Sequence, residues 1–484
     1  MLAVALDQTR LEVSPTLDPK RRSALGQFMT PSPIAHKMSG MFGVLPDKIH
    51  LLDAGAGMGS LTAAFVDEAC SRRPRPTSIH VSAYEVDPAM ASILEGTLKQ
   101  CQEACADAGI EFTSTLVRDD FILCSAEPLL KPKGTVNCAI LNPPYGKIRS
   151  NSQWRAALGA VGIETVNLYS AFVALALQQM SEGGELVAIT PRSFCNGTYY
   201  EPFRRMLLNG AALLDLFVFQ SRTEAFKDDD VLQENIIFRV QRGGAQGAVA
   251  LSTDAGEVRT VPYEEIVRPD DNHSFIRLPV GGDGTPSLQG LPCTLEDLDI
   301  KVSTGRVVDF RARDHLRKDP EDGTVPLIYP GHMYNGGINW PRAEFKKNNA
   351  IADNDETASL MVPKGVYVLT KRFTSKEEKR RLVAAVYNGG KVGFENHLNY
   401  YHANGRGLDR DFASGLARYL NSTAVDQYFR TFSGHTQVNA TDLRNIRYPT
   451  KDDLQKLGTT DDEPDRFVDR LLQASALNCF AGSS

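Results

Sequence analysis

Short apolar runs alternate with longer helical stretches between about residues 49 and 240. The runs that resemble strands are IHLLDAG, IHVSAYEV, CAILNPP, GELVAIT, LLDLFVF and NIIFRV. Parallel strands need long crossover connections, which are usually helices, so this alternation predicts a mostly parallel sheet with helices on both faces. We therefore expect the first half of the chain to form an α/β domain.

The first of these strands leads into a glycine-rich turn within LLDAGAGMGSLTAAF (51–65). Glycines at alternate positions let the backbone turn tightly and let a ligand approach the main chain. The next strand ends at Glu85, where folds of this kind place a carboxylate that accepts hydrogen bonds from ribose hydroxyls. An ordinary turn and a solvated acid are the alternatives. The residues expected to contact the ligand here are Asp53, Ala54, Gly55, Gly57 and Glu85.

A third strand ends at RDDFIL (118–123), which repeats the arrangement. Asp120 is available to the exocyclic amine of an adenine ring, and Phe121 can cover the face of that ring. Three acidic strand ends in succession fit a ligand that contains adenosine. NAD and S-adenosylmethionine both meet that condition, so a further feature must separate them.

The strand CAIL (138–141) is followed directly by Asn-Pro-Pro-Tyr. Proline lacks the backbone N–H that a sheet needs and restricts the residue before it, so a loop must begin at Asn142. This loop lies at the carboxyl end of a strand, where open α/β sheets bind ligands. An ordinary turn is the alternative if the tetrapeptide is considered alone.

The tetrapeptide suits methyl transfer to an aromatic amine. The lone pair of adenine N6 is delocalised into the ring, so the nitrogen becomes nucleophilic only as it turns tetrahedral. Two hydrogen-bond acceptors favour that change, and they are the Asn142 side-chain oxygen and the Pro143 carbonyl. Tyr145 offers a flat surface on which a base can stack. The catalytic residues expected are Asn142, Pro143, Pro144 and Tyr145, with Asn142 also beside the cofactor.

DAGAGMG, YEVD, RDDF and NPPYG together resemble successive motifs of γ-class N6-adenine DNA methyltransferases of restriction–modification systems, which are Eco57I- and TaqI-like. The match includes 167–180 and 183–194 and begins upstream at GQFMTP (26–31). The resemblance implies a Rossmann-like class I methyltransferase domain with S-adenosylmethionine as its cofactor. It also implies that four residues close over the methionine end of the cofactor: Gln27, Phe28, Thr30 and Pro31.

The same resemblance implies an apolar residue that packs against a flipped-out target base. The segment EAFKDDDVLQENIIFRV (224–240) occupies the corresponding position and offers Phe226 or Phe238 beside Tyr145. Both phenylalanines could instead belong to the core, and for Phe238, within an apolar strand, the core is the favoured interpretation.

Charge is distributed unevenly along the 484 residues. The net charge of −6 hides a segment, 297–450, with 23 Lys and Arg against 18 Asp and Glu, so this segment is at +5 and the remainder at −11. A basic region on an acidic enzyme suits a phosphate backbone, although +5 is a weak signal. Within it, STGRVVDFR, PLIYPGHMYN and the segment 433–449 resemble target-recognition domains.

We therefore predict a catalytic domain over 1–248 with an N-terminal arm over 1–23, a linker over 249–296, a mixed α+β target-recognition domain over 297–455 and a tail over 456–484. The expected partner is double-stranded DNA with a short specific site, and a separate restriction endonuclease is a possible cognate. Cytosine N4 is the nearest alternative target, and glutamine in proteins is a more distant one. A DNA-binding module with a dead catalytic fold is disfavoured by the intact Asn142 and Tyr145.

Composition adds few further constraints. No apolar run approaches the roughly 20 residues needed to cross a bilayer, and the N-terminus lacks the pattern of a secretion signal. We expect a cytoplasmic protein with no membrane partner. The eight cysteines are scattered, and Cys101 and Cys105 lack partners at metal-binding spacing, so no metal site is expected.

Overall fold

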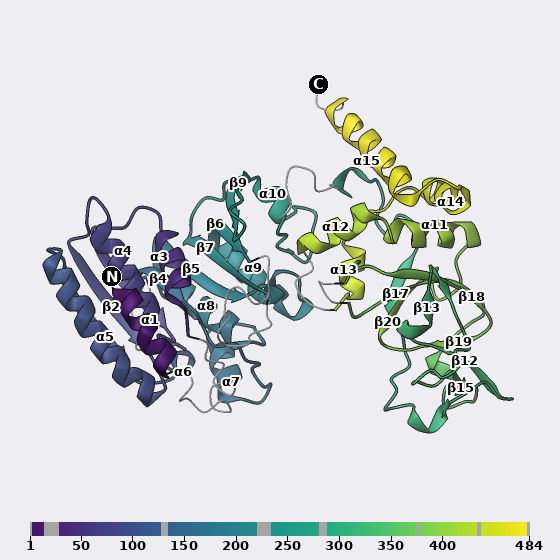
Figure 1. The fold of residues 1–484 in the computed structure, drawn as a ribbon, viewed down its shortest axis with the longest axis horizontal. Coiled ribbons are helices and arrows are strands. Elements are labelled where there is room, and N and C mark those ends of the chain that lie inside the picture. The colour runs from purple at the N-terminus through teal and green to yellow at the C-terminus, as the bar shows by residue number, and fades with distance from the viewer. Residues whose placement is uncertain are drawn as a thin grey trace. The chain divides into compact units, whose positions relative to one another are not determined.

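The computed structural model describes residues 2–13, 29–126, 134–219, 234–279, 288–374, 378–432 and 437–481. The chain divides into two compact units, Met1–Val280 (unit 1) and Gly281–Ser484 (unit 2), each with its own sheets and helices (Figure 1). Among the described residues, no helix is both long and apolar enough to cross a membrane.

Unit 1 is built on a nine-stranded sheet with the order β3-β2-β1-β4-β5-β7-β6-β8-β9. β1 pairs in parallel with β2 and β4, β2 with β3, β4 with β5, and β6 with β8, whereas β7 runs antiparallel to β5 and β6. The strands are β1 (Lys48–Ala54), β2 (Ser78–Tyr84), β3 (Glu111–Val117), β4 (Val136–Leu141), β5 (Met180–Pro191), β6 (Ala211–Val218), β7 (Asn235–Arg242), β8 (Val249–Thr253) and β9 (Val258–Val261).

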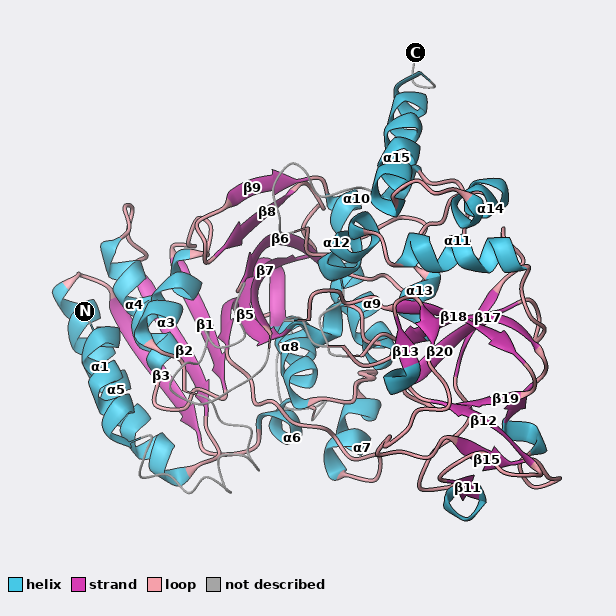
Figure 2. Cartoon of the chain, turned by 45° about the vertical axis from the view of Figure 1, so that its right-hand side comes forward, coloured by secondary structure: helices cyan, strands magenta, loops and turns pink. Residues whose placement is uncertain are grey.

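Helices cover both faces of this sheet (Figure 2). Successive strand side chains point to opposite faces, and the core divides accordingly: Leu51 packs with α1, α3, α4 and α5, and Leu52 packs with the residues of α8 and α9. The helices are α1 (Leu2–Val13), α3 (Ser32–Gly40), α4 (Ser60–Ser71), α5 (Pro88–Asp107), α6 (Phe121–Ser125), α7 (Gln153–Ala160), α8 (Leu168–Gln179), α9 (Glu201–Gly210) and α10 (Tyr263–Ile266).

The segment expected as a linker over 249–296 is divided in the structure. β8 and β9 extend the large sheet, and residues up to 279 belong to unit 1. β8 joins the sheet because its apolar residues alternate. Val249 and Leu251 are buried in the core of unit 1, whereas the residues of a linker would be exposed to solvent. Unit 1 therefore extends about thirty residues beyond the predicted boundary at 248.

Unit 2 mixes small sheets with helices. A four-stranded sheet has the order β10-β20-β17-β18, and a five-stranded sheet has the order β11-β15-β12-β19-β16. The strands are β10 (Lys301–Thr304), β11 (Leu316–Arg317), β12 (Thr324–Ile328), β13 (Met333–Tyr334), β14 (Gly337–Ile338), β15 (Ala350–Ala352), β16 (Met361–Val362), β17 (Gly365–Lys371), β18 (Ala384–Gly389), β19 (Val392–Phe394) and β20 (Leu398–His402). The helices are α11 (Arg410–Leu420), α12 (Thr423–Phe432), α13 (Ala440–Arg444), α14 (Lys451–Thr459) and α15 (Pro464–Ala481).

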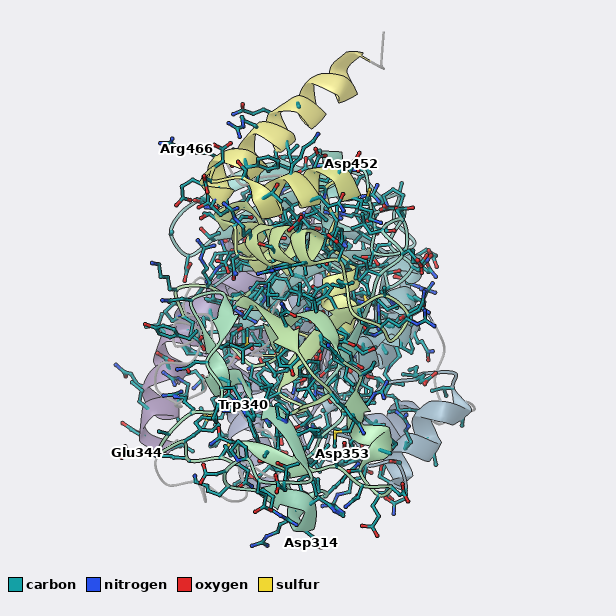
Figure 3. All side chains as sticks on the ribbon, turned by 90° about the vertical axis from the view of Figure 1, so that its right-hand side faces the viewer. Asp314, Trp340, Glu344, Asp353, Asp452 and Arg466 are labelled. Carbon is teal, nitrogen blue, oxygen red and sulfur yellow. The ribbon has the colours of Figure 1, made fainter. Side chains whose placement is uncertain are left out.

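The helices gather on one side of unit 2 and the short strands on the other. In Figure 3 the helical side carries the labelled Asp452 and Arg466, and the strand side carries Asp314, Trp340, Glu344 and Asp353. With an α/β unit followed by a mixed α+β unit, the predicted fold class is confirmed.

The predicted tail, 456–484, begins inside α14. This helix packs closely on α11 because two glycines face each other: a Cβ on Gly415 would lie 1.7 Å from the Leu454 carbonyl oxygen, and one on Gly458 would lie 1.8 Å from that of Asp411. Leu457 is fully buried. The first part of the predicted tail is therefore an integral part of unit 2.

Candidate active site

The glycine-rich turn joins β1 to α4 at the carboxyl edge of the sheet. Gly55, Gly57 and Gly59 have φ of 75°, 55° and 89°, a region that side chains rarely adopt. A Cβ on Gly57 would meet no atom within 4 Å, whereas one on Gly59 would lie 2.8 Å from Leu94 Cδ1. Gly59 thus lets α4 pack on α5, and Gly57 leaves the open space that a ligand needs.

Glu85 follows β2 and connects the turn to the next helix. Its carboxylate accepts a hydrogen bond from the Gly57 N–H at 2.8 Å and one from the Asp87 N–H at 2.7 Å. Burial raises the pKa of this carboxyl group above its usual value. Each carboxylate oxygen can accept more than one bond, so these two bonds are compatible with the ribose contact predicted for Glu85, which stays a prediction.

Asp53 contacts the protein itself, whereas the sequence predicted that it would contact a ligand. It is fully buried in β1, and its Oδ2 accepts a hydrogen bond from the Thr62 hydroxyl of α4 at 2.6 Å. Burial raises its pKa to about 7. This contact ties the strand to the helix across the turn, so any effect of Asp53 on a ligand is expected to act through the turn. Ala54 is also fully buried.

Asp120 and Phe121 lie at the start of α6, which follows β3. Asp120 caps α6 by accepting from the Leu123 N–H at 3.0 Å, and its other oxygen accepts from the Trp154 indole N–H at 2.9 Å. The Phe121 ring lies 5.0 Å from that of Phe172 between ring centres. A Cβ on Gly55 would lie 3.5 Å from Phe172 Cε1. The aromatic pair therefore reaches the glycine turn.

The Asn-Pro-Pro-Tyr loop lies against two other predicted segments. A Cβ on Gly55 would lie 3.8 Å from Pro144 Cδ. Asn142 Nδ2 donates a hydrogen bond to the Thr30 hydroxyl oxygen at 2.9 Å, which orients the carboxamide. The sequence separation of these two residues is 112. The fold thus brings together the glycine turn, the N-terminal Thr-Pro motif and the Asn-Pro-Pro-Tyr loop.

Tyr145 lies within a cluster of aromatic rings. Its hydroxyl donates to Asn142 Oδ1 at 3.4 Å, and its ring meets that of Tyr169 edge to face at 6.3 Å. Tyr169 is stacked on Tyr200 at 5.7 Å. Burial raises the pKa of Tyr145, which keeps the phenol neutral and able to donate this hydrogen bond.

The remaining predicted residues differ in what the structure says of them. Gln27, Phe28 and Phe226 lie outside the described residues. Phe238 is 1% exposed in β7 and packs against Phe194, which favours the core interpretation over contact with a base. Pro31 precedes α3 as its N-cap, and Pro143 is buried.

Sequence reasoning missed Thr62, Trp154 and Phe172. Phe172 lies within a segment that resembles the family, and its apolar periodicity predicts only a buried helix. Trp154 follows the catalytic loop without any recognisable motif. Among the described residues, no group of His, Cys, Asp and Glu side chains could hold a metal ion.

Comparisons with known proteins identify the family. Residues 96–226 match the model of the Eco57I restriction-modification methylase family. The solved type IIG restriction endonuclease BpuSI is 14% identical, with 92% of this chain and 63% of that chain covered and a TM-score of 0.44. The type II methyltransferase M.PstI of Providencia stuartii is 46% identical over 476 residues, which cover 94% of this chain and 93% of M.PstI. M.BsuBI of Bacillus subtilis is 45% identical over the same shares.

The chain belongs to the type II methyltransferases. The resemblance on the four motifs is thereby confirmed, and this type II methyltransferase is a DNA methyltransferase of the restriction–modification kind. Its cofactor is S-adenosylmethionine. The residues present fit that group, because Gly57 borders open space and donates a hydrogen bond to the buried Glu85 carboxylate, and Gly55 lies beside Phe172, whose ring contacts that of Phe121.

Proposed function

We propose that this methyltransferase transfers a methyl group to N6 of an adenine that is flipped out of double-stranded DNA at a short specific site. It would act as the modification component of a restriction–modification system, with cleavage by a separate endonuclease. Unit 2 would recognise the site, as the target-recognition resemblance implies. The observation that carries the proposal is the Asn142 carboxamide, oriented by Thr30 and contacted by Tyr145.

The orientation of Asn142 decides which atom it presents to a substrate. Its amide nitrogen donates to Thr30, so its oxygen is the atom on the side of the Tyr145 hydroxyl. An oxygen there can accept a hydrogen bond from an amino group, and the Pro143 carbonyl is a second acceptor. Both bonds strengthen as the nitrogen becomes tetrahedral, which stabilises the transition state rather than the ground state.

S-adenosylmethionine supplies an electrophilic methyl group when it is bound. The residues of the chain have three other tasks. Glu85 and the glycine turn hold the nucleoside, Asn142 and Pro143 accept from the reacting amine, and Tyr145 supports the base by stacking. Because no side chain needs to remove a proton before methyl transfer, the high pKa of the buried Tyr145 phenol is compatible with this mechanism.

Cytosine N4 is the second candidate target, because its amine needs the same two acceptors. Enzymes for cytosine N4 more often have serine at the position of Asn142, which favours adenine here. A protein glutamine methyltransferase also uses Asn-Pro-Pro-Tyr around a planar amide. Such an enzyme has no need of the roughly two hundred residues of unit 2, so this candidate is the weakest.

The direct test incubates the protein with labelled S-adenosylmethionine and DNA, protein or RNA, and then identifies the methylated base by mass spectrometry. We expect N6-methyladenine in DNA. Asn142→Ala should reduce the single-turnover rate of methyl transfer by a factor on the order of 100. Removal of one hydrogen bond to the transition state has an effect of this size in other enzymes. Binding of the cofactor and of DNA should largely survive. Recovery of N4-methylcytosine, or an unchanged rate in Asn142→Ala, would contradict the proposal.

A further inference from the structure

The chain that leaves the catalytic loop runs beside the segment that leads into α8. The Ile148 N–H donates to the Val166 carbonyl at 2.7 Å, and the Leu168 N–H donates to the Gly146 carbonyl at 2.8 Å. These bonds form a short antiparallel pair directly after Tyr145. The segment is therefore held in place by backbone hydrogen bonds as well as by any buried side chain.

Side chains alternate along this short pair. Lys147 is bridged to Asn167 in the antiparallel sense, and successive residues of an extended segment point to opposite faces. Ile148 points inward and is 7% exposed, whereas Lys147 and Arg149 are exposed. The pairing thus places two cationic side chains on the outer face.

These two cations have no protein partner among the described residues. No hydrogen bond or ion pair involves the side chain of Lys147 or Arg149 in the described ranges, in contrast to Arg155, which donates to the Thr165 carbonyl. Glu164, an exposed acid on the partner segment, forms no ion pair with either of them in this part of the chain. Both positive charges are therefore available to an anion.

The backbone that carries Arg149 is fixed on its other side as well. The Ser152 N–H donates to the Arg149 carbonyl at 3.1 Å, and the Ser152 hydroxyl donates to the same oxygen at 2.8 Å. The Ser152 hydroxyl also caps α7 by accepting from the Arg155 N–H. Because the main chain is already ordered, binding through these side chains does not incur the entropy cost of ordering a loop.

The distance of Lys147 and Arg149 from Tyr145 indicates which anion they would bind. Two residues along an extended segment separate their Cα atoms by about 6.6 Å, and four residues span at most about 14 Å. Lys147 and Arg149 therefore lie within that reach of Tyr145. A base held at Tyr145 remains covalently attached to its own strand, so the nearest phosphates are those that flank the extruded nucleotide.

We propose that Lys147 and Arg149 form a phosphate-binding site that contacts the backbone of the target strand beside the extruded base. This inference rests on the proposed function and assigns two residues to a part of the substrate that the catalytic loop does not contact. Cationic contacts with phosphates release counterions, so they set affinity and its salt dependence without reading sequence.

The test compares wild type with Lys147→Ala/Arg149→Ala. Fluorescence anisotropy measures the affinity for a duplex that contains the adenine methylated by wild type, with S-adenosylhomocysteine present. Loss of two phosphate contacts should reduce the slope of log affinity against log salt by about 1.8. The ratio of wild-type affinity to variant affinity should then fall about 25-fold as salt rises from about 0.05 to 0.3 M.

Two controls make the result specific. Lys48→Ala/Lys99→Ala removes the same charge from exposed positions at the amino-terminal start of β1 and on α5, and its salt slope should match that of wild type. Lys147→Arg/Arg149→Lys keeps both charges and should keep the slope. An unchanged slope in the double alanine variant, or an equal fall in the control, would overturn the inference.

Single-turnover methylation at saturating DNA separates this inference from the proposed function. Wild type must methylate the duplex, and if it does not, the proposed function itself fails. The double alanine variant should methylate within about threefold of the wild-type rate once DNA is saturating, because Asn142 and Tyr145 are intact. A loss of rate that saturation does not relieve would show that the two residues act in the methyl-transfer step instead of binding the backbone.

Discussion

Thr30 offers the sharpest test of how the site is oriented. Its hydroxyl oxygen, 5% exposed, accepts a hydrogen bond from Asn142 Nδ2 at 2.9 Å. Thr30→Val keeps the shape of the side chain and removes this acceptor, so the carboxamide loses one of the contacts that direct its oxygen. A neutral hydrogen bond contributes about 0.5–1.5 kcal/mol, which corresponds to roughly 2- to 13-fold in rate. We expect the single-turnover rate of methylation to fall within that range.

A double-mutant cycle with Asn142→Ala distinguishes orientation from other effects. If Thr30 acts only by orienting the carboxamide, Thr30→Val should have almost no effect once that carboxamide is absent. The coupling between the two substitutions should then be about 1 kcal/mol. Rapid-quench measurements with labelled S-adenosylmethionine and saturating DNA give the four rates. Thr30→Ser retains the hydroxyl and should stay near the wild-type rate.

The cycle can also refute the reasoning. The family resemblance implies that Thr30 contacts the methionine end of the cofactor. In that case Thr30→Val should weaken S-adenosylhomocysteine binding, measured by calorimetry, and should slow both backgrounds by the same factor. Equal losses with and without Asn142 would therefore show that the hydrogen bond does not orient the catalytic carboxamide.

Three further predictions concern separate parts of the site. Glu85→Ala should weaken S-adenosylhomocysteine binding by about 1.5–3 kcal/mol, since hydrogen bonds to a charged acceptor are lost, and DNA affinity should change little in the same preparation. Tyr145→Ala should weaken retention of the flipped base by roughly 1–3 kcal/mol, visible as altered 2-aminopurine fluorescence at the target position, whereas Tyr145→Phe should resemble wild type. Asp53→Asn should flatten the fall in the free energy of unfolding between pH 4 and pH 7, measured by urea denaturation, because the native state, with a pKa of about 7, holds a proton there that the unfolded chain, near 3.8, releases.

Features that depend on local sequence could be predicted well. The strand that contains Asp53 and the strands ahead of Glu85 and Asn142 all form, and the loop at Asn142 begins where the two prolines require it. Parallel strands end at a common edge, so their terminal residues meet there without further information. This is why the glycine turn and the catalytic loop could be assigned to one site from motifs alone.

Features that depend on burial and distant partners could not be predicted. Asp53 and Glu85 both follow the pattern of an acid at a strand end, yet Asp53 accepts a hydrogen bond from Thr62 of α4, whereas Glu85 accepts one from the Gly57 N–H of the turn. Phe238 is another example, because an aromatic residue in a strand can face a core or a pocket. Its 1% exposure follows from packing against Phe194, which is 44 residues away in the sequence.

The misplaced domain boundary has the same cause and bears on function. Arg204 in α9 is fully buried, and its guanidinium donates to the His273 carbonyl at 2.9 Å and to the Phe194 and Gly197 carbonyls at 2.8 and 2.6 Å. Burial lowers the pKa of this group to about 10, so it stays charged at neutral pH and requires these acceptors.

Through Arg204, the stretch that ends near residue 279 is therefore connected to the loop before Tyr200. Tyr200 stacks on Tyr169, whose ring contacts Tyr145 edge to face. A bond across 69 residues cannot be inferred from local pattern, and polar composition made this stretch resemble a linker. In the folded protein it is instead connected, through Arg204 and Tyr200, to the aromatic rings beside Tyr145. We therefore propose that a correctly shaped site needs the chain through residue 279.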